Sequence, residues 1–159
     1  MIQWKKRKLL ALMPILEEYK FLSKDESTKI AAFIIDGSYT IRSMGVNSFP
    51  RGINDNDPKR QERPEKYFWF EHAERNTIYN AGRTRADIWA CWMIMTCGMP
   101  CADCARAIIQ AGLEGIILQS RGKCVVTNKQ LWDEHAIRAE QMFKESGVTV
   151  LYLDEMVDE

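Results

Sequence analysis

Two short segments of the sequence carry side chains suited to holding one metal ion. The first reads His-Ala-Glu at residues 72–74, and the second reads Pro-Cys-Ala-Asp-Cys at residues 100–104. One imidazole nitrogen and two thiolates are ligands that Zn²⁺ prefers. Because a single ion has to touch all three side chains, the two segments must meet in space. This requirement constrains the fold more than any other feature of the chain.

The sequence therefore predicts His72, Cys101 and Cys104 as zinc ligands. Three protein ligands leave a fourth tetrahedral position for water, which is the arrangement of a catalytic rather than a structural zinc site. The H-x-E…P-C-x-x-C pattern is typical of zinc-dependent nucleobase deaminases. Glu74 is the predicted general acid/base, which carries a proton from the water to a ring nitrogen and then to the leaving ammonia. The backbone N–H of Ala73 is expected to hold the carbonyl group of the base.

The same residues leave other interpretations open. The C-x-x-C segment has the spacing of a thioredoxin-like redox motif. A structural zinc site would need a fourth protein ligand, which Cys97, Cys124 or His135 could supply. A catalytically silent, zinc-stabilised binding module is a third interpretation, against which the intact Glu74 argues.

Length, charge and cysteine content limit the class of protein. A chain of 159 residues is expected to form one domain over residues 1–159. The 22 basic and 22 acidic residues cancel, so the chain lacks the positive field that usually accompanies nucleic-acid binding. Neither a membrane span nor a signal peptide is expected. Five cysteines, an odd number with two in the C-x-x-C, indicate a reducing compartment and predict the cytoplasm; Cys91, Cys97 and Cys124 are expected to be core or free thiols.

Hydrophobic periodicity and turn residues predict the elements of the first half of the chain. A helix over 4–21 is followed by a hairpin of two strands, at 30–35 and 39–46. Asp36-Gly37 predicts a two-residue turn between these strands. The polar segment 49–64 is expected to be a long loop, and long ordered loops in compact domains tend to be functional.

From residue 72 onward, predicted helices and strands alternate. This order indicates a mixed five-stranded sheet with helices on its faces. A helix between the last two strands makes them parallel, because such a crossover connection almost requires it. The expected elements are helices at 72–82, 100–111 and 129–146, and strands at 88–96, 115–119 and 148–153.

Three segments resemble the deoxycytidylate (dCMP) deaminase family of the cytidine deaminase superfamily, and its phage type in particular. Residues 23–35 resemble the family's Ser-Lys-Asp-x-Ser-Thr-Lys turn and the strand that follows it. Residues 45–52 resemble its Gly-Tyr-Asn-Gly-Phe-Pro-Arg-Gly loop, and residues 72–78 match its His-Ala-Glu-x-Asn-Ala-Ile helix. The likeness covers roughly residues 5–153 and implies a three-layer α/β/α cytidine deaminase-like fold.

The resemblance implies a zinc-dependent hydrolytic deamination of dCMP to dUMP, the precursor for thymidylate synthesis. It also implies a hexamer that dCTP activates and dTTP inhibits, with Mg²⁺ on the regulatory triphosphate. The expected location is the cytoplasm, which is the host cytoplasm if the protein is phage-encoded. Deamination of dCTP as well, or of a base in tRNA or another nucleic acid, is the alternative, and the neutral charge argues against a nucleic acid.

The resemblance also assigns residues to two nucleotide sites. Asn47 is expected to contact the sugar or the base of the substrate. Arg83 is expected to lie near the substrate phosphate or at a subunit contact. The residues assigned to the regulatory nucleotide site are Ser27, Lys29, Asn47 and Arg51, from the turn at 27–29 and the loop at 47–52.

Overall fold

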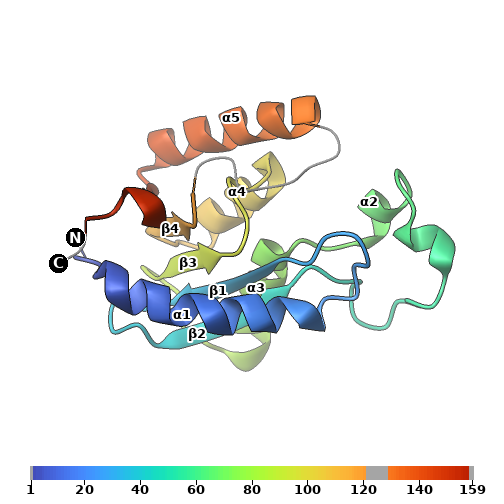
Figure 1. Cartoon of the computed structure of the whole chain (residues 1–159), viewed down its shortest axis with the longest axis horizontal. Helices are drawn as coiled ribbons and strands as arrows, with labels where there is room; N and C mark the ends of the chain where they lie inside the picture. The colour runs from blue at the N-terminus through green and yellow to red at the C-terminus, as the bar shows by residue number, and fades with distance from the viewer. Residues whose placement is uncertain (1, 121–128, 158–159) are drawn as a thin grey trace.

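A twisted sheet forms the middle layer of the protein (Figure 1). The computed structural model describes residues 2–120 and 129–157, and within these ranges five strands pair in the order β2-β1-β3-β4-β5. β1 runs antiparallel to both β2 and β3, whereas β3, β4 and β5 are parallel. This confirms the predicted mixed five-stranded sheet with its last two strands parallel, and extends the parallel part to β3. The strands are β1 (Ala31–Ile35), β2 (Ile41–Val46), β3 (Trp92–Met95), β4 (Gly115–Leu118) and β5 (Thr149–Tyr152).

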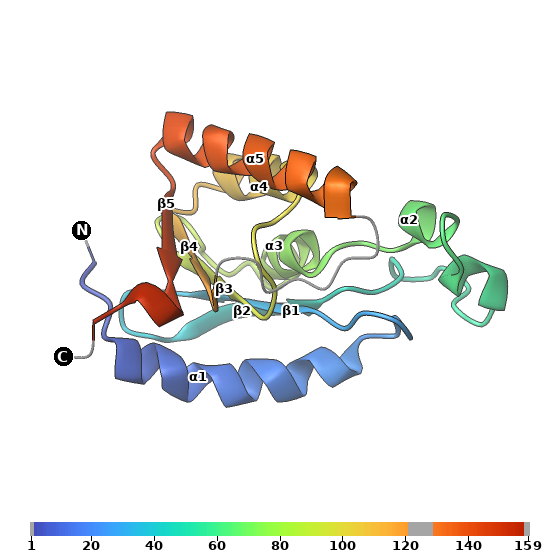
Figure 2. The ribbon, with the colours of Figure 1, turned by 45° about the horizontal axis from the view of Figure 1, so that its top comes forward.

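Helices cover both faces of the sheet. In Figure 2, α1 lies alone below the sheet, and α3, α4 and α5 lie above it. The predicted three-layer α/β/α arrangement is therefore confirmed. No helix within the described ranges has both the length and the apolar character needed to cross a membrane. The helices are α1 (Lys6–Tyr19), α2 (Lys66–Trp69), α3 (Ala73–Thr84), α4 (Ala102–Gln110) and α5 (Lys129–Ser146), with short 3-10 turns at Lys20–Leu22, Pro58–Gln61 and Leu153–Glu155.

Two hydrophobic cores result from the alternation of side chains along each strand. β1 is buried along its whole length, as expected for a central strand with helices on both faces. Its Phe33 packs against α1, and its Ile34 packs against the three helices on the opposite face. The α1 side also contains Leu9, Leu16, Trp92, Ile94 and Ile117, and the other side contains Ala73, Met93, Ile108, Ile116 and Phe143.

α3 lies unusually close to the sheet at the point where it crosses β1 and β2. The hydroxyl oxygen of Thr77 lies 2.9 Å from the carbonyl oxygen of Ala32 in β1. Ser43 in β2 donates a hydrogen bond of 2.7 Å to the carbonyl oxygen of Thr77. Gly45 faces Thr77, and a Cβ atom there would come within 2.5 Å of the Thr77 backbone nitrogen. The absence of a side chain at residue 45 is therefore what lets α3 approach the sheet.

The hairpin between β1 and β2 differs from the predicted two-residue turn. Five residues, 36–40, connect the strands, and Tyr39 rather than Gly37 adopts the left-handed conformation, with φ of 66°. The carboxylate of Asp36 accepts hydrogen bonds from the backbone N–H groups of Ser38 and Thr40 and so shapes the longer turn. The Tyr39 ring packs edge-on against Trp4, 5.1 Å between centroids. This tertiary contact favours the longer turn over the local Asp-Gly preference.

Two other element boundaries differ from prediction. α3 continues past Gly82, because Arg85 adopts the left-handed conformation and closes the helix with a Schellman pair of hydrogen bonds. β3 begins only at Trp92, since residues 88–91 form a turn in which Ala90 has a φ of 57°. The bounds of α5, in contrast, agree with the prediction.

The segment between β2 and α3 projects beyond the end of the sheet (Figure 1). The predicted long loop at 49–64 contains the 3-10 turn Pro58–Gln61, and α2 follows it. After α2 the chain returns to the sheet region, where Ser48 and Glu71 form an isolated antiparallel bridge. This bridge sets the path of the chain immediately before residue 72.

We predict that Gly45→Ala destabilises the protein by about 2 kcal/mol, because the new methyl group would overlap backbone atoms that cannot move away separately. The free energy of unfolding from urea titrations followed by circular dichroism measures this effect. Gly82→Ala is the matched control, since nothing lies within 4 Å of a Cβ at that helical position. We expect the control to stabilise the protein by roughly 0.5–1 kcal/mol. Equal effects of the two substitutions would contradict the close approach of α3.

Candidate active site

The predicted metal ligands lie where the N-termini of α3 and α4 converge. His72 is the N-cap residue of α3, and Cys101 is the N-cap residue of α4. Cys104 lies in the first turn of α4 and is fully buried. Both helices pack on the same face of the sheet. The two segments that the sequence requires to meet are thus brought together by neighbouring helix starts.

The three ligand atoms are placed as one tetrahedral ion requires. The Nδ1 atom of His72 lies 3.6 Å from the sulfur of Cys101 and 3.4 Å from the sulfur of Cys104. Zinc–sulfur bonds of about 2.3 Å and zinc–nitrogen bonds of about 2.0 Å at tetrahedral angles separate N and S by roughly 3.5 Å. The potential ligand atoms all lie within 4.8 Å of one another. The residues present therefore fit a zinc ion.

Without a metal ion, the two thiols are coupled. A hydrogen bond from the Cys104 thiol lowers the pKa of Cys101 to about 3, with a further contribution from His72. The same hydrogen bond, together with burial, raises the pKa of Cys104. Burial alone would lower the pKa of His72, but the hydrogen bond with Cys101 and the charge of Glu74 raise it. Cys101 therefore has thiolate character, which suits a cation site.

Glu74 occupies the second position of α3 and is only 5% exposed. Burial raises the pKa of its carboxyl group, and the thiolate of Cys101 adds to this effect. The carboxyl group also lies close to the sulfur of Cys104. Glu74 is therefore next to the metal ligands and can hold a proton at a higher pH than an exposed glutamate. These are the properties required of a proton carrier.

Arg75 is a site residue that the sequence analysis missed. Its guanidinium group donates to the sulfur of Cys104 at 3.7 Å and to the carboxylate of Glu71 at 2.5 Å. The same carboxylate accepts the backbone N–H of His72 at 3.0 Å. Arg75 therefore brings a positive charge to the sulfur atoms of the centre and holds Glu71, the residue that precedes the metal ligand. The spacing of Glu71 and Arg75, four residues apart across a helix start, was the available signal.

Two residues considered as a fourth ligand have other partners. The Nδ1 atom of His135 accepts a hydrogen bond of 3.2 Å from the backbone N–H of Ala102, in the first turn of α4. Cys97 is disulfide-bonded, which corrects the expectation of a free thiol. Cys91 is a buried free thiol, as predicted. Cys124 lies outside the described residues, and within them the potential metal ligands that cluster are His72, Cys101 and Cys104 alone.

Asn47 lies next to the Ser48–Glu71 bridge, in a buried polar network. Its side chain donates to the carboxylate of Asp25 at 3.1 Å and to the carbonyl oxygen of Thr28 at 2.7 Å. Its side-chain oxygen accepts the backbone N–H of Ile30 at 2.8 Å. The next residue, Ser48, pairs with Glu71 through two backbone hydrogen bonds. Asn47 is therefore connected to the metal centre through the backbone, while its amide group holds the 25–30 turn.

The residues assigned to substrate phosphate and regulation fall into two places. Ser27 and Lys29 join the network of Asn47, through Asp25 and Ser23 respectively. Arg51 is exposed and donates to Asn80 on α3, away from that network. Arg83 is exposed near the end of α3, about 14 Å along the helix axis from Glu74 at 1.5 Å per residue. The structure gathers the first two with Asn47 and leaves both arginines apart from them.

Most of the chain matches one protein family. Residues 5–120 match the family described as the cytidine and deoxycytidylate deaminase zinc-binding region. The matched range contains the three potential metal ligands and Glu74.

Individual relatives agree with this match. The chain is 34% identical over 131 residues to an uncharacterized deaminase in the luxG 3′ region of Aliivibrio fischeri, covering 82% of this chain and 83% of the relative. It is 33% identical over 132 residues to the deoxycytidylate deaminase of Mus musculus, covering 80% of this chain and 68% of the relative.

Solved structures show the same fold. The dCMP deaminase of cyanophage S-TIM5, crystallised with dCMP and dUMP, superposes with a TM-score of 0.72 at 20% identity, over 94% of this chain and 99% of that one. Sequence match, fold and the convergence of one histidine and two cysteines agree, and the chain belongs to the cytidine and deoxycytidylate deaminase family.

Proposed function

We propose that the protein catalyses the hydrolytic deamination of dCMP, in which water replaces the exocyclic amino group to give dUMP and ammonia. The assignment of dCMP as the substrate is supported by the 33% identity to a deoxycytidylate deaminase over 80% of the chain. The site geometry supports the reaction type, because a buried carboxyl group adjoins three residues that fit a zinc ion. The balanced overall charge fits a free nucleotide better than a nucleic acid.

Each residue of the site has a distinct part in this reaction. His72, Cys101 and Cys104 would hold the zinc ion, which when bound supplies the Lewis acidity that activates water. Glu74 takes the proton from the attacking water and delivers it to the ring nitrogen N3 of cytosine. It then takes the second proton of that water, now on the hydroxyl group at C4, and passes it to the amino group. The C4–N bond breaks and the C4=O bond of dUMP forms, so ammonia leaves neutral and the carboxylate is regenerated. The raised pKa of Glu74 suits a group that must both accept and donate.

Other residues orient the substrate and balance charge. The N–H of Ala73, at the first position of α3 and free of an intrahelical partner there, would hold the carbonyl oxygen of cytosine. Asn47 contributes to sugar or base recognition, and its side-chain oxygen has a second lone pair beyond the one used by Ile30. Arg83 lies about 14 Å along α3 from Glu74. It is therefore assigned to the substrate phosphate, which is remote from the reacting base, or to a subunit contact.

The proposal also includes regulation by nucleotides and assembly into an oligomer. Activation by dCTP, inhibition by dTTP, Mg²⁺ on the triphosphate and a hexameric assembly follow from the sequence resemblance. The grouping of Ser27 and Lys29 with Asn47 supports one shared nucleotide site near the active site. Arg51 would join that site only from another subunit or after a loop movement, because its side chain is bonded to Asn80.

We predict that Glu74→Gln lowers kcat for dCMP by a factor of about 10² to 10⁴, because the amide cannot carry a proton. Ammonia release measures turnover, and metal analysis of the same sample should show that zinc is retained. Glu114→Gln is the matched control, since Glu114 is an exposed residue directly before β4. A glutamine variant at position 74 that keeps wild-type turnover would show that Glu74 is not the proton carrier.

We also predict that dCMP is deaminated in preference to deoxycytidine, dCTP, a tRNA or a single-stranded oligonucleotide. The assay is ammonia release from each substrate, with and without dTTP and dCTP in the presence of Mg²⁺. Preference for dCTP or for a nucleic acid would replace the proposed substrate. Rates on dCMP that neither effector changes would refute the regulatory part and leave the catalytic part intact.

A further inference from the structure

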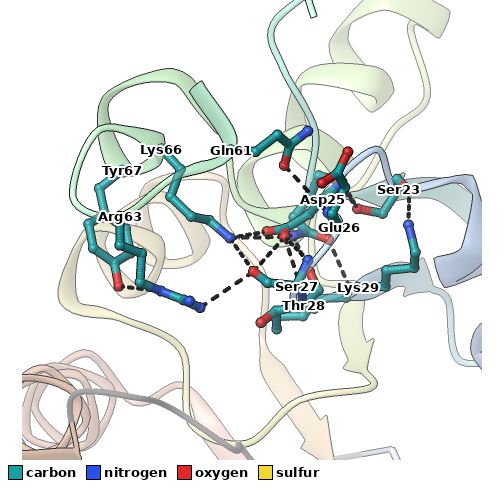
Figure 3. A network of polar contacts seen from close by, with 12 residues as sticks. Ser23, Asp25, Glu26, Ser27, Thr28, Lys29, Gln61, Arg63, Lys66 and Tyr67 are labelled. Atoms are coloured by element: carbon teal, nitrogen blue, oxygen red, sulfur yellow. Dashed lines mark hydrogen bonds and ion pairs between the residues drawn. The ribbon is translucent and has the colours of Figure 1, made fainter. Parts of the chain in front are cut away.

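A buried ion pair lies outside the catalytic chemistry described above. The ammonium group of Lys66 in α2 lies 2.7 Å from Oδ2 and 2.9 Å from Oδ1 of Asp25 (Figure 3). Their side chains are only 6% and 4% exposed. Removing two opposite charges from water is costly, and well-packed apolar residues often serve stability equally well. A pair retained at such a position therefore calls for an explanation other than stability alone.

Hydrogen bonds use all three N–H donors of Lys66 and both oxygens of Asp25. Lys66 uses its third N–H to reach the hydroxyl of Ser27 at 2.8 Å, and that hydroxyl donates to Asp25. Asp25 also accepts the backbone N–H groups of Ser27 and Thr28. Burial opposes the charge of Asp25, but the contact with Lys66 and these backbone donors lower the pKa of its carboxyl group. Asp25 is therefore a carboxylate with a fixed orientation.

This orientation determines that of Asn47. The side-chain NH₂ group of Asn47 points to the Asp25 carboxylate and to the carbonyl oxygen of Thr28, so its oxygen must face Ile30. The backbone of Asn47 is held as well, because its N–H donates to Ile30 and its carbonyl oxygen accepts the hydroxyl of Ser23. An Asn47 amide rotated by half a turn would place donors against donors.

The ion pair is connected to the metal centre through the two chain segments that form the Ser48–Glu71 bridge. Asn47 precedes Ser48, and Ser48 exchanges backbone hydrogen bonds of 3.1 Å and 2.8 Å with Glu71. Glu71 precedes His72, the imidazole ligand of the centre. Lys66 itself begins α2, from which the chain runs directly to Glu71. The ion pair therefore ties together the two segments whose pairing places His72.

We propose that Lys66 is a positioning residue, which through Asp25 fixes the segment 47–48 and thereby the position of His72 relative to Cys101 and Cys104. The pair acts on geometry and touches neither the metal ligands nor the reacting atoms. Its effect on metal binding is independent of the substrate. Its effect on Asn47 rests on the proposed function, and there it predicts a raised KM for dCMP.

The test compares Lys66→Met with a matched control, Lys24→Met. Lys24 pairs with Asp55 and so connects the same two regions of the chain, but its side chain is 59% exposed. Zinc is replaced with Co²⁺, whose visible and thiolate charge-transfer bands report ligand geometry, and zinc affinity is measured by competition with a chelator. We expect Lys66→Met to alter the Co²⁺ bands and to weaken zinc binding about tenfold, as loss of groups that orient metal ligands does. Lys24→Met should leave both within twofold of wild type.

The outcomes separate positioning from simple stabilisation. Lys66→Met with a lower melting temperature, but with wild-type Co²⁺ bands and zinc affinity in the folded protein, would overturn the proposal. If this variant does not fold, Asp25→Asn is judged by the same two measurements, since it keeps the volume while turning a donor toward Asn47. A wild-type protein that binds zinc but does not deaminate dCMP would refute the proposed function. The Co²⁺ bands and the zinc affinity of the variants would still decide whether Lys66 positions the metal ligands.

Discussion

The close packing of α3 against β1 and β2 is the constraint on which the rest of the active site depends. Gly45 offers no side chain at the crossing point, and Thr77 bonds to the backbone of β1 there. This contact fixes where the helix begins, and its N-cap is the imidazole ligand. β3, which pairs with β1, delivers the chain to α4 on the same face. Small residues at one crossing thus set the distance between ligands that are 29 and 32 residues apart.

Two buried carboxyl groups show how surroundings decide chemistry. Glu74 and Asp25 are 5% and 3% exposed, yet their pKa values shift in opposite directions. Burial raises the pKa of the Glu74 carboxyl group, and the nearby Cys101 thiolate adds to this effect. Asp25 faces the ammonium of Lys66 and several backbone N–H groups, so its charged form is favoured despite burial. The first can carry protons, whereas the second keeps one charge state and is suited to holding structure.

Sequence reasoning succeeded where the signal was local or repeated. The predicted bounds of α5 agree with the structure, and the mixed sheet follows from the order of elements. It was wrong at the hairpin, where Asp36 and the Tyr39–Trp4 contact override an Asp-Gly preference. It was wrong at the end of α3, where Arg85 rather than a glycine takes the left-handed conformation. In both cases the deciding backbone conformation is one that local propensity disfavours but neighbouring contacts stabilise.

By itself, the sequence determined the metal-ligand set, the carboxyl group beside it and the requirement that two helix starts meet. These follow because zinc chemistry limits both residue types and spacing. Only the tertiary structure decided what surrounds them. Arg75 donates a hydrogen bond to Cys104, His135 accepts one from the first turn of α4, and Lys66 pairs with Asp25, which in turn contacts Asn47. The first three contacts join residues 29, 33 and 41 positions apart. Their energy depends on burial and direction, which no spacing along the chain encodes.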